Sequence, residues 1–397
     1  MMILDKEFLF FKKYKVSIIT VIWFILAAIA VILEISRGRD SINNYLIYKG
    51  VFSHCIAQTP IYIEYPLEYE FTNHYGPVFS LIIAPFALMP DVMGCFLWTI
   101  LNALILFYAI RKLPFSTTKQ NLVLSIGLIE MMTASHNLQF NTMLTGWIVL
   151  SYIFVKEEKD IWATLLVVAG FYVKLYGIVG IVFWLFSKHK IKYIGYFIWW
   201  FAVLFCLPML LSSPSYIQQS YWDWFDTLVI KNKKNSNAIA NNFMQDISVM
   251  GMIRRIFNIQ QLKNFYITVP AALMYVLPFL RWKQFKYEAF QLSYLALALI
   301  GVVIFSTSAE SATYVIAMLG VAIWFTLQKE NNKIAQVILI FALIFTSLSP
   351  TDLFPEYVRN NFIRPYSLKA LPCFLVWLLL VYQLIKKDFS TVNLNYE

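Results

Sequence analysis

Residues 16–35 read VSIITVIWFILAAIAVILEI, an almost unbroken apolar run. A helix needs about 20 such residues to cross a bilayer core of roughly 30 Å, so this run is long enough to span a membrane. Further apolar runs, some of them shorter, occupy residues 92–110, 191–211 and 337–348. The chain is 60% hydrophobic and 14% charged, whereas a soluble domain is about 45–50% apolar and about 25% charged. The sequence therefore predicts an all-α polytopic membrane protein and excludes a soluble domain.

The first apolar run follows the basic residues Lys6, Lys12, Lys13 and Lys15. A cleaved signal peptide has an apolar region of only about 7–15 residues, and this run is longer. The stretch Ala27-Ala28-Ile29-Ala30 has the small residues of a cleavage site. The length of the run nevertheless favours a first span that stays in the protein.

The net charge of +10 comes largely from Lys and Arg residues between the apolar runs. No RNA- or DNA-binding motif accompanies them, so we expect no nucleic-acid partner. The cysteines (Cys55, Cys95, Cys206 and Cys373) form no CxxC pair, and the histidines form no HxxxH pair. The sequence therefore predicts no disulfide framework and no metal site, and it identifies no cofactor.

Positively charged loops of membrane proteins gather on the cytoplasmic side. Clusters of Lys and Arg mark that side at residues 6–15, 111–119, 156–159, 188–192, 281–286, 329–333 and 386–387. The outer connections between them imply about 12 spans, within a range of about 11–13, in one domain that covers residues 1–397. Both termini are then cytoplasmic, in a plasma (inner) membrane. The longest outer loops are residues 36–75 and 212–263.

Three segments outside the long spans carry local signals. Asp40-Ser41, followed by apolar residues at helical spacing up to Gly50, predicts a capped amphipathic helix that lies at the membrane interface. The polar run 231–242 predicts a mobile middle for the second outer loop. The apolar segment 77–90, which Pro85 interrupts, is either re-entrant or a further span.

Lys174 interrupts the apolar stretch 161–186. This stretch is too long for one span and too short for two ordinary ones. We therefore expect two short helices that meet at Lys174, near the outer surface but still within the bilayer. A charge there is expensive, so Lys174 either holds a lipid phosphate or extends its ammonium to the headgroups.

Other polar residues are predicted on the outer side, and each has two interpretations. Glu130, with Gln139 and Asn141, either lines a site or joins helices through hydrogen bonds. Glu310 lies in the tight serine-rich turn 306–311, which is either solvated or borders a cavity. The pair Arg254-Arg255 either neutralises a phosphate or anchors to lipid headgroups. Asp40, just past the first span, is either a helix cap or a catalytic carboxylate.

Several short motifs follow one another in a fixed order along the chain. They are Asp40 with Asn44, Tyr45 and Tyr48; Tyr75-Gly76-Pro77, opening the segment that ends at Pro90; Trp98 and Asn102; Gln139-Phe140-Asn141; Lys174-Leu175-Tyr176; and the turn from Ser308 to Tyr314. In their order and spacing the chain resembles glycosyltransferase family 87, the polyprenyl-phosphate-mannose-dependent type of the GT-C superfamily.

The resemblance implies a GT-C-like enzyme that moves a hexose, mannose-like, from a polyprenyl-phosphate sugar donor to a glycan or glycolipid acceptor. It implies an active site on the extracytoplasmic face, inversion at the anomeric carbon, and Asp40 as the general base. Carried over by position, Lys174 holds the donor phosphate, and Tyr75, Gln139 and Asn141 line the pocket. The remaining candidates from the sequence are Arg254 and Arg255 for the phosphate, and Tyr45 and Glu310 for the pocket.

Sugar transfer from a lipid phosphate needs three features of the protein. A carboxylate must reach the acceptor hydroxyl, cations must stabilise the leaving phosphate, and an apolar groove must admit the membrane lipid. The charge pattern places Asp40 and Lys174 on the same outer side, which supports the implied roles.

Other functions are also compatible with the sequence. A transporter or flippase predicts pseudo-symmetric halves, and we see no internal duplication. A polysaccharide polymerase or ligase of the cell envelope usually has its key arginines and large loop late in the chain, whereas the larger outer loop here, 212–263, is central. An inactive homologue that kept the fold is the remaining alternative.

Overall fold

The computed structural model describes residues 7–10, 14–237 and 244–392. Helices make up 76% of it, so the predicted all-α class is confirmed. The chain divides into two compact units, which we name after a residue of each. The Lys174 unit comprises residues 20–112 and 131–230, and the Arg254 unit comprises the rest of the described chain.

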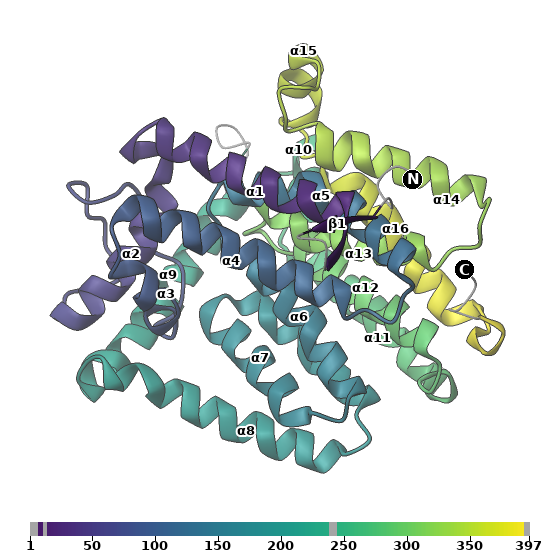
Figure 1. Cartoon of the computed structure of the whole chain (residues 1–397), viewed down its shortest axis with the longest axis horizontal. Coiled ribbons are helices and arrows are strands. Elements are labelled where there is room, and N and C mark those ends of the chain that lie inside the picture. Colours follow the sequence, from purple (N-terminus) through teal and green to yellow (C-terminus); the bar gives the residue numbers. More distant parts are fainter. Residues whose placement is uncertain (1–6, 11–13, 238–243, 393–397) are drawn as a thin grey trace. The chain divides into compact units, whose positions relative to one another are not determined.

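The Lys174 unit is built from helices of very different length. They are most of α1 (Ile18–Ser36), η1 (Arg39–Ile42), α2 (Asn43–Ala57), α3 (Phe79–Ala87), α4 (Asp91–Arg111), the end of α5 (Thr117–His136), α6 (Asn141–Lys156), α7 (Asp160–Val173), η2 (Leu175–Phe186), α8 (Lys190–Cys206), η3 (Leu207–Leu210) and most of α9 (Pro214–Asn237). Helices α6, α7 and α8 pack side by side (Figure 1).

The Arg254 unit begins with a short antiparallel hairpin, in which Glu7 of β1 (Glu7–Phe10) lies opposite Ser17 of β2 (Tyr14–Ser17). Its helices are the start of α5, the end of α9, α10 (Val249–Phe257), α11 (Phe265–Val276), η4 (Leu277–Gln284), α12 (Glu288–Ile304), η5 (Ser311–Thr313), α13 (Tyr314–Thr326), α14 (Lys333–Ala342), η6 (Leu343–Leu348), α15 (Glu356–Val358), η7 (Arg359–Ile363), α16 (Ala370–Lys386) and η8 (Phe389–Thr391).

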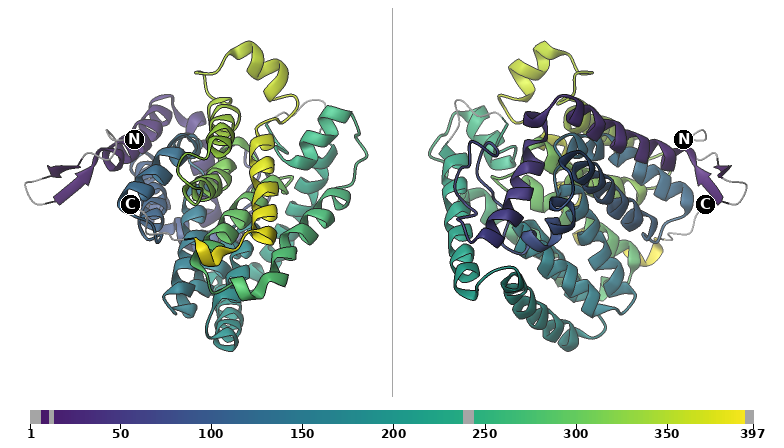
Figure 2. Two further views of the ribbon diagram at one scale, coloured as in Figure 1. Left: turned by 90° about the vertical axis from the view of Figure 1, so that its right-hand side faces the viewer. Right: turned by 60° about the vertical axis from the view of Figure 1, so that its left-hand side comes forward.

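The core of the Arg254 unit is the group of α12, α13 and α16 (Figure 2). Almost every residue of α12 from Ala289 to Ile304 is buried. A helix that is apolar all round is stable only when other elements cover all its faces. The packing of α13 and α16 against α12 provides that cover.

Within the described residues, four helical segments are long and apolar enough to cross a membrane. They are α1, α4, α8 with η3, and α11 with η4. Six further apolar helices have only 10–17 residues, which corresponds to about 15–26 Å at 1.5 Å per residue. The structure therefore does not confirm the predicted count of about 12 spans. Hydropathy reports apolar length, but it does not report where the chain interrupts a helix.

The segment 77–90 contains α3, a helix of nine residues with Pro85 inside it. Nine residues rise only about 14 Å, less than half of a bilayer core. Of the two interpretations of this segment, a further span formed by α3 alone is therefore excluded.

The first outer loop differs from its prediction. Helix α2 begins only after the turn η1, and its N-cap residue Ile42 makes no side-chain cap hydrogen bond. The predicted cap by Asp40-Ser41 is thus wrong, because the chain makes a 3-10 turn at these residues before α2 starts. The predicted amphipathic character is wrong as well, since α2 buries residues on all its faces, among them Tyr45, Leu46 and Ile47.

The second outer loop is largely helical, with α9 and α10 inside it. The polar run 231–242, for which the sequence predicts mobility, forms the end of α9 up to Asn237. Residues 238–243 lie outside the described part of the chain, so that prediction is not tested there.

Candidate functional site

Lys174 lies at the break between two helices, as predicted. Helix α7 ends at Val173, Lys174 is extended with φ −151° and ψ 118°, and η2 begins at Leu175. The two helices then run close together, because a Cβ on Gly177 would lie 2.4 Å from the Gly170 Cα. Only glycine allows this approach, and it leaves the half-buried Lys174 at the turn between the two helices.

The Lys174 ammonium starts a chain of directed hydrogen bonds. Its Nζ donates to Asn141 Oδ1 at 2.7 Å, and Asn141 Nδ2 donates to Gln139 Oε1 at 2.8 Å. An ammonium can only donate, so Asn141 must present its oxygen to Lys174 and its NH₂ to Gln139. Gln139 in turn presents its oxygen to Asn141, which directs its NH₂ group away from Asn141. We call these three residues the Lys174 relay.

Aromatic rings surround the ammonium at the start of the relay. Lys174 Nζ lies 5.8 Å from the ring centroid of Tyr75 and 5.1 Å from that of Tyr176. The hydroxyls of Tyr75 and Tyr48 are 3.0 Å apart, and the Tyr75 ring stacks on Phe79 at 4.7 Å. The predicted residues Tyr75, Gln139, Asn141 and Lys174 therefore do come together, and Tyr48 joins them.

Gly76 explains why the Tyr75 segment can reach Lys174. Its backbone N–H donates to the carbonyl of Val173 at 3.1 Å, directly before Lys174. A Cβ at position 76 would lie 1.9 Å from the backbone oxygen of Tyr172, so no other residue fits without a backbone shift.

Replacing Gly76 by Ala is expected to separate the two segments and to lower the midpoint of thermal denaturation of the purified protein. Gly195 is the matched control, because a Cβ there meets nothing within 4 Å. Gly195→Ala should leave the midpoint unchanged or raise it slightly, since Ala is favoured over Gly in a helix. Equal midpoints for Gly76→Ala and wild type would refute the close-approach argument.

Trp98 and Asn102, the next motif of the sequence, hold the corner between α5 and α6. Trp98 Nε1 donates to the carbonyl of Leu138 at 3.0 Å, and Asn102 Oδ1 accepts from the backbone N–H of Met143 at 3.2 Å. Both side chains are buried on α4. These bonds fix the backbone on both sides of Gln139 and Asn141, so the motif positions the relay.

Asp40 lies in η1 and is exposed. Its carboxylate makes no hydrogen bond or ion pair with any residue that the structure describes. Tyr45 is buried, and its hydroxyl donates to the carbonyl of Phe86 at 2.8 Å rather than to the Lys174 relay. The unit therefore contains both predicted partners, Asp40 and Lys174, without a direct contact between them.

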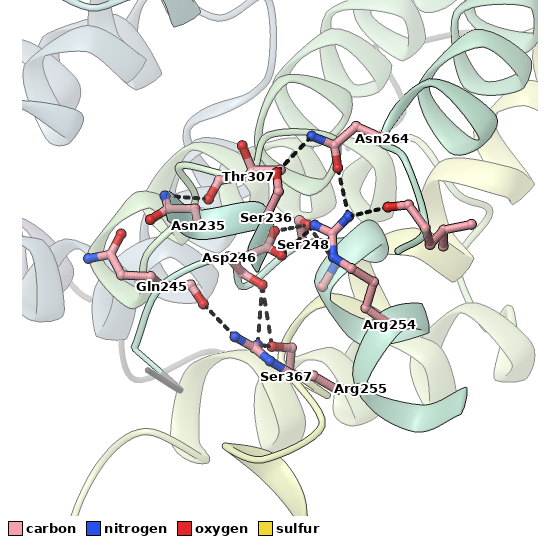
Figure 3. A network of polar contacts seen from close by, with 12 residues as sticks. Asn235, Ser236, Gln245, Asp246, Ser248, Arg254, Arg255, Asn264, Thr307 and Ser367 are labelled. Atoms are coloured by element: carbon pink, nitrogen blue, oxygen red, sulfur yellow. Dashed lines mark hydrogen bonds and ion pairs between the residues drawn. The ribbon is translucent and has the colours of Figure 1, made fainter. Parts of the chain in front are cut away.

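Arg254 lies in the Arg254 unit, within the buried network of Figure 3. It is 0% exposed, and its Nη2 forms an ion pair with Asp246 Oδ2 at 2.7 Å. Its Nη1 donates to Asn264 Oδ1 at 2.8 Å and to the carbonyl of Leu262 at 3.0 Å. This guanidinium therefore binds the two sides of the second outer loop together.

Arg255 extends from the same helix to the other side of Asp246 (Figure 3). It donates to the carbonyl of Gln245 at 2.9 Å and contacts the hydroxyl of Ser367. Burial lowers the pKa of the Arg255 guanidinium and raises the pKa of the Asp246 carboxyl, while Ser248 and Arg254 act on Asp246 in the opposite direction. Both arginines thus have protein partners in this structure, and their predicted phosphate role is not tested by it.

Glu310 is the N-cap of η5, in the predicted serine-rich turn. Its Oε1 accepts from Gln245 Nε2 at 2.9 Å and lies 3.4 Å from Lys231 Nζ. Glu310 therefore connects the late turn to the second outer loop within the Arg254 unit.

Glu130 is buried and forms an ion pair with Lys369, at 2.8 Å between Oε1 and Nζ. Lys369 also donates to Ser311 Oγ at 3.0 Å and lies 5.0 Å from the ring centroid of Tyr314. Of the two interpretations of Glu130, joining helices fits this pair. Lys369 did not stand out in the sequence, because the only signal, a lysine at the start of an apolar run, is common at membrane interfaces.

Comparison with known families gives one result. The sequence profile of glycosyltransferase family 87 matches residues 71–350, more than half of the chain. The matched region contains the Tyr75 segment, Trp98, the Lys174 relay and the serine-rich turn, whereas Asp40 precedes it. No curated protein matches the chain.

Proposed function

The chain belongs to glycosyltransferase family 87, and on that basis we propose that it transfers a mannose-like hexose from a polyprenyl-phosphate donor to a glycan or glycolipid acceptor. The family implies a glycosyltransferase, and the apolar helices place it in a membrane. The donor, the acceptor and the outer location of the site are our proposal.

The Lys174 relay is the observation that supports a phosphate donor. A leaving phosphate already carries charge, so it needs cations and hydrogen-bond donors rather than a proton. The relay combines an ammonium between aromatic rings with an amide NH₂ group that the hydrogen-bond order directs away from Asn141. We assign Lys174 to the phosphate and Gln139 to the phosphate or the sugar hydroxyls.

Asp40 is the proposed general base. The acceptor oxygen attacks the anomeric carbon, the bond from that carbon to the phosphate oxygen breaks, and polyprenyl phosphate leaves with the electron pair. The hydroxyl proton passes to the Asp40 carboxylate. Attack opposite to the leaving group inverts the anomeric centre. An exposed carboxylate that has no side-chain partner in the described part of the chain is available for this step, which supports the assignment.

Three further candidates have side chains that are occupied by contacts within the protein. These candidates are Arg254, Arg255 and Glu310. Arg254 is paired with Asp246, Arg255 contacts Ser367, and Glu310 accepts from Gln245. A direct role at the donor therefore requires these contacts to rearrange. We assign the phosphate to Lys174 first, and the roles of these three residues remain predictions.

The proposed topology keeps both termini cytoplasmic and the site extracytoplasmic, in the plasma membrane. The four long apolar helices span the bilayer, and shorter apolar helices, when tilted, add further spans. The described residues contain four long and six shorter apolar helices, which make ten at most, so the total of about 12 spans stays a prediction. The Lys174 break then lies at the outer surface.

Replacing Lys174 by Met is expected to weaken binding of a polyprenyl-phosphate-linked hexose by about 10–100-fold, because a charge-assisted hydrogen bond contributes about 1.5–3 kcal/mol. Affinity is measured with purified protein in detergent. Lys188→Met is the control, since Lys188 pairs with Glu158 at an exposed site. If Lys174→Met binds the donor as tightly as wild type, the phosphate role of Lys174 is wrong.

A further inference from the structure

Glu34 is a carboxylate at the end of the first span, and its side chain is only 9% exposed. One of its oxygens, Oε1, accepts from His136 Nδ1 at 2.7 Å and from Arg37 Nη1 at 2.8 Å. An ionised carboxylate only accepts hydrogen bonds, so Nδ1 of His136 carries a proton. A buried carboxylate is retained at low cost only with such partners. The pair therefore connects the end of α1 to the end of α5 firmly.

A second hydrogen bond reaches the corner between α5 and α6, and it comes from a residue that follows Asp40 in the chain. Asn44, in the first turn of α2, donates from Nδ2 to the carbonyl of Asn137 at 2.8 Å. Glu34 precedes Asp40 by six residues, and Asn44 follows it by four. The chain that carries Asp40 is thus attached at both ends to the consecutive residues His136 and Asn137.

The corner between α5 and α6, which receives both bonds, also carries two of the three relay residues, Gln139 and Asn141. Gln139 and Asn141 follow His136 by three and five residues. Trp98 fixes the intervening Leu138 from α4. This corner is therefore one of the routes that fix the position of Asp40 relative to the relay, beside the contact of Tyr48 on α2 with Tyr75.

Among the residues that the structure describes, the Asp40 side chain makes no bond that could replace these attachments. The other contacts of its turn lead elsewhere, from Arg39 Nη2 to the carbonyl of Glu68 at 3.0 Å and between Asn43 and the backbone of Glu70. They connect the turn to a later part of the same outer loop. Without Glu34, that loop stays connected internally but loses one of its two attachments to the corner.

We propose that Glu34 is a positioning residue, which acts through His136 to hold Asp40 at its working distance from the Lys174 relay. The inference rests on the proposed function for the roles of Asp40 and Lys174. Glu34 itself is not assigned to the substrate.

The kinetic test uses Glu34→Ala and His136→Ala, with a polyprenyl-phosphate-linked hexose as donor. We expect kcat to fall by about 100-fold, since a misplacement of about 1 Å can have that effect, while KM for the donor stays unchanged because the relay is intact. Glu34→Gln retains an oxygen that accepts from His136, and it should recover part of kcat. Glu158→Ala, which removes an exposed carboxylate, is the control. An unchanged kcat in Glu34→Ala overturns the proposal.

Hydrogen exchange of the purified protein supplies a readout that does not depend on activity. In Glu34→Ala, exchange should increase in residues 37–44 and 134–141 and stay unchanged in residues 170–177. An increase over the whole Lys174 unit means that Glu34 only stabilises the fold, and it overturns the positioning role. If wild type transfers no sugar, the proposed function fails, and this exchange pattern still decides whether Glu34 holds the two segments together.

Discussion

Replacing Asp40 by Asn is expected to slow sugar transfer by about 10²–10⁴-fold, the range associated with loss of a general base. The amide keeps the size of the side chain but cannot take the acceptor proton. The Asp40 side chain has no partner among the described residues, so the change removes no hydrogen bond or ion pair that the structure describes. The rate is measured as single-turnover transfer from a polyprenyl-phosphate-linked hexose to a glycolipid acceptor.

Donor affinity separates the loss of a base from damage to the site. Asp40→Asn should bind the donor as wild type does, since the Lys174 relay does not include Asp40. Glu64→Gln, an exposed carboxyl in the same outer loop, is the matched control and should retain full activity. Full activity in Asp40→Asn would assign the base to another residue.

Replacing Lys369 by Met should destabilise the protein more than any other single change discussed above. It leaves Glu130 fully buried without its cation, and removal of one partner of a buried ion pair costs about 3–5 kcal/mol. It also removes the ammonium that donates to Ser311 Oγ, and Ser311 is the first residue of η5. The midpoint of thermal denaturation in detergent should fall by several degrees.

The double variant Glu130→Leu/Lys369→Met distinguishes two causes of destabilisation: an unpaired buried charge and altered side-chain packing. When both charges of a buried pair are replaced by apolar groups, stability often stays the same or rises. The double variant should therefore denature at a higher temperature than Lys369→Met alone. Lys188→Met, from an exposed pair, should denature like wild type. A double variant that is less stable than the single variant would mean that the two residues do not act as a pair.

The sequence allows correct predictions where the signal is local. The apolar stretch around Lys174 has a length that fits neither one nor two ordinary spans, and this predicts the helix break that the structure has. The family resemblance implies a place in the pocket for Gln139 and Asn141. Asn141 is the first residue of α6 and bonds to Lys174, and Gln139 lies two residues before it and bonds to Asn141. Gly76 and Trp98 are motif residues whose purpose becomes evident only from their backbone contacts.

Long-range pairings could not be read from the sequence. Lys369 is 239 residues away from Glu130, and Glu34 is 102 residues away from His136. No periodicity relates such positions, so only the folded chain identifies them. The partner of Arg254, by contrast, is Asp246, eight residues earlier in the same loop. A basic pair that follows an acid so closely is a signal for an internal ion pair.

The cap predicted at Asp40-Ser41 failed for a physical reason. Asp and Ser favour both helix caps and turns, because their short side chains bond to nearby backbone groups. The chain uses a turn there and starts α2 after Ile42. In that turn the Asp40 side chain accepts no cap hydrogen bond from the backbone of η1 or α2.

Transfer from a lipid-linked donor is the measurement that tests the central claim most directly. Purified wild type in lipid vesicles is given polyprenyl-phosphate-linked mannose and glycolipid acceptors, and both the glycosylated product and free polyprenyl phosphate are quantified. We predict one polyprenyl phosphate released for each sugar transferred, with the opposite anomeric configuration in the product. Transfer from a nucleotide sugar, with none from the lipid-linked donor, would contradict the account.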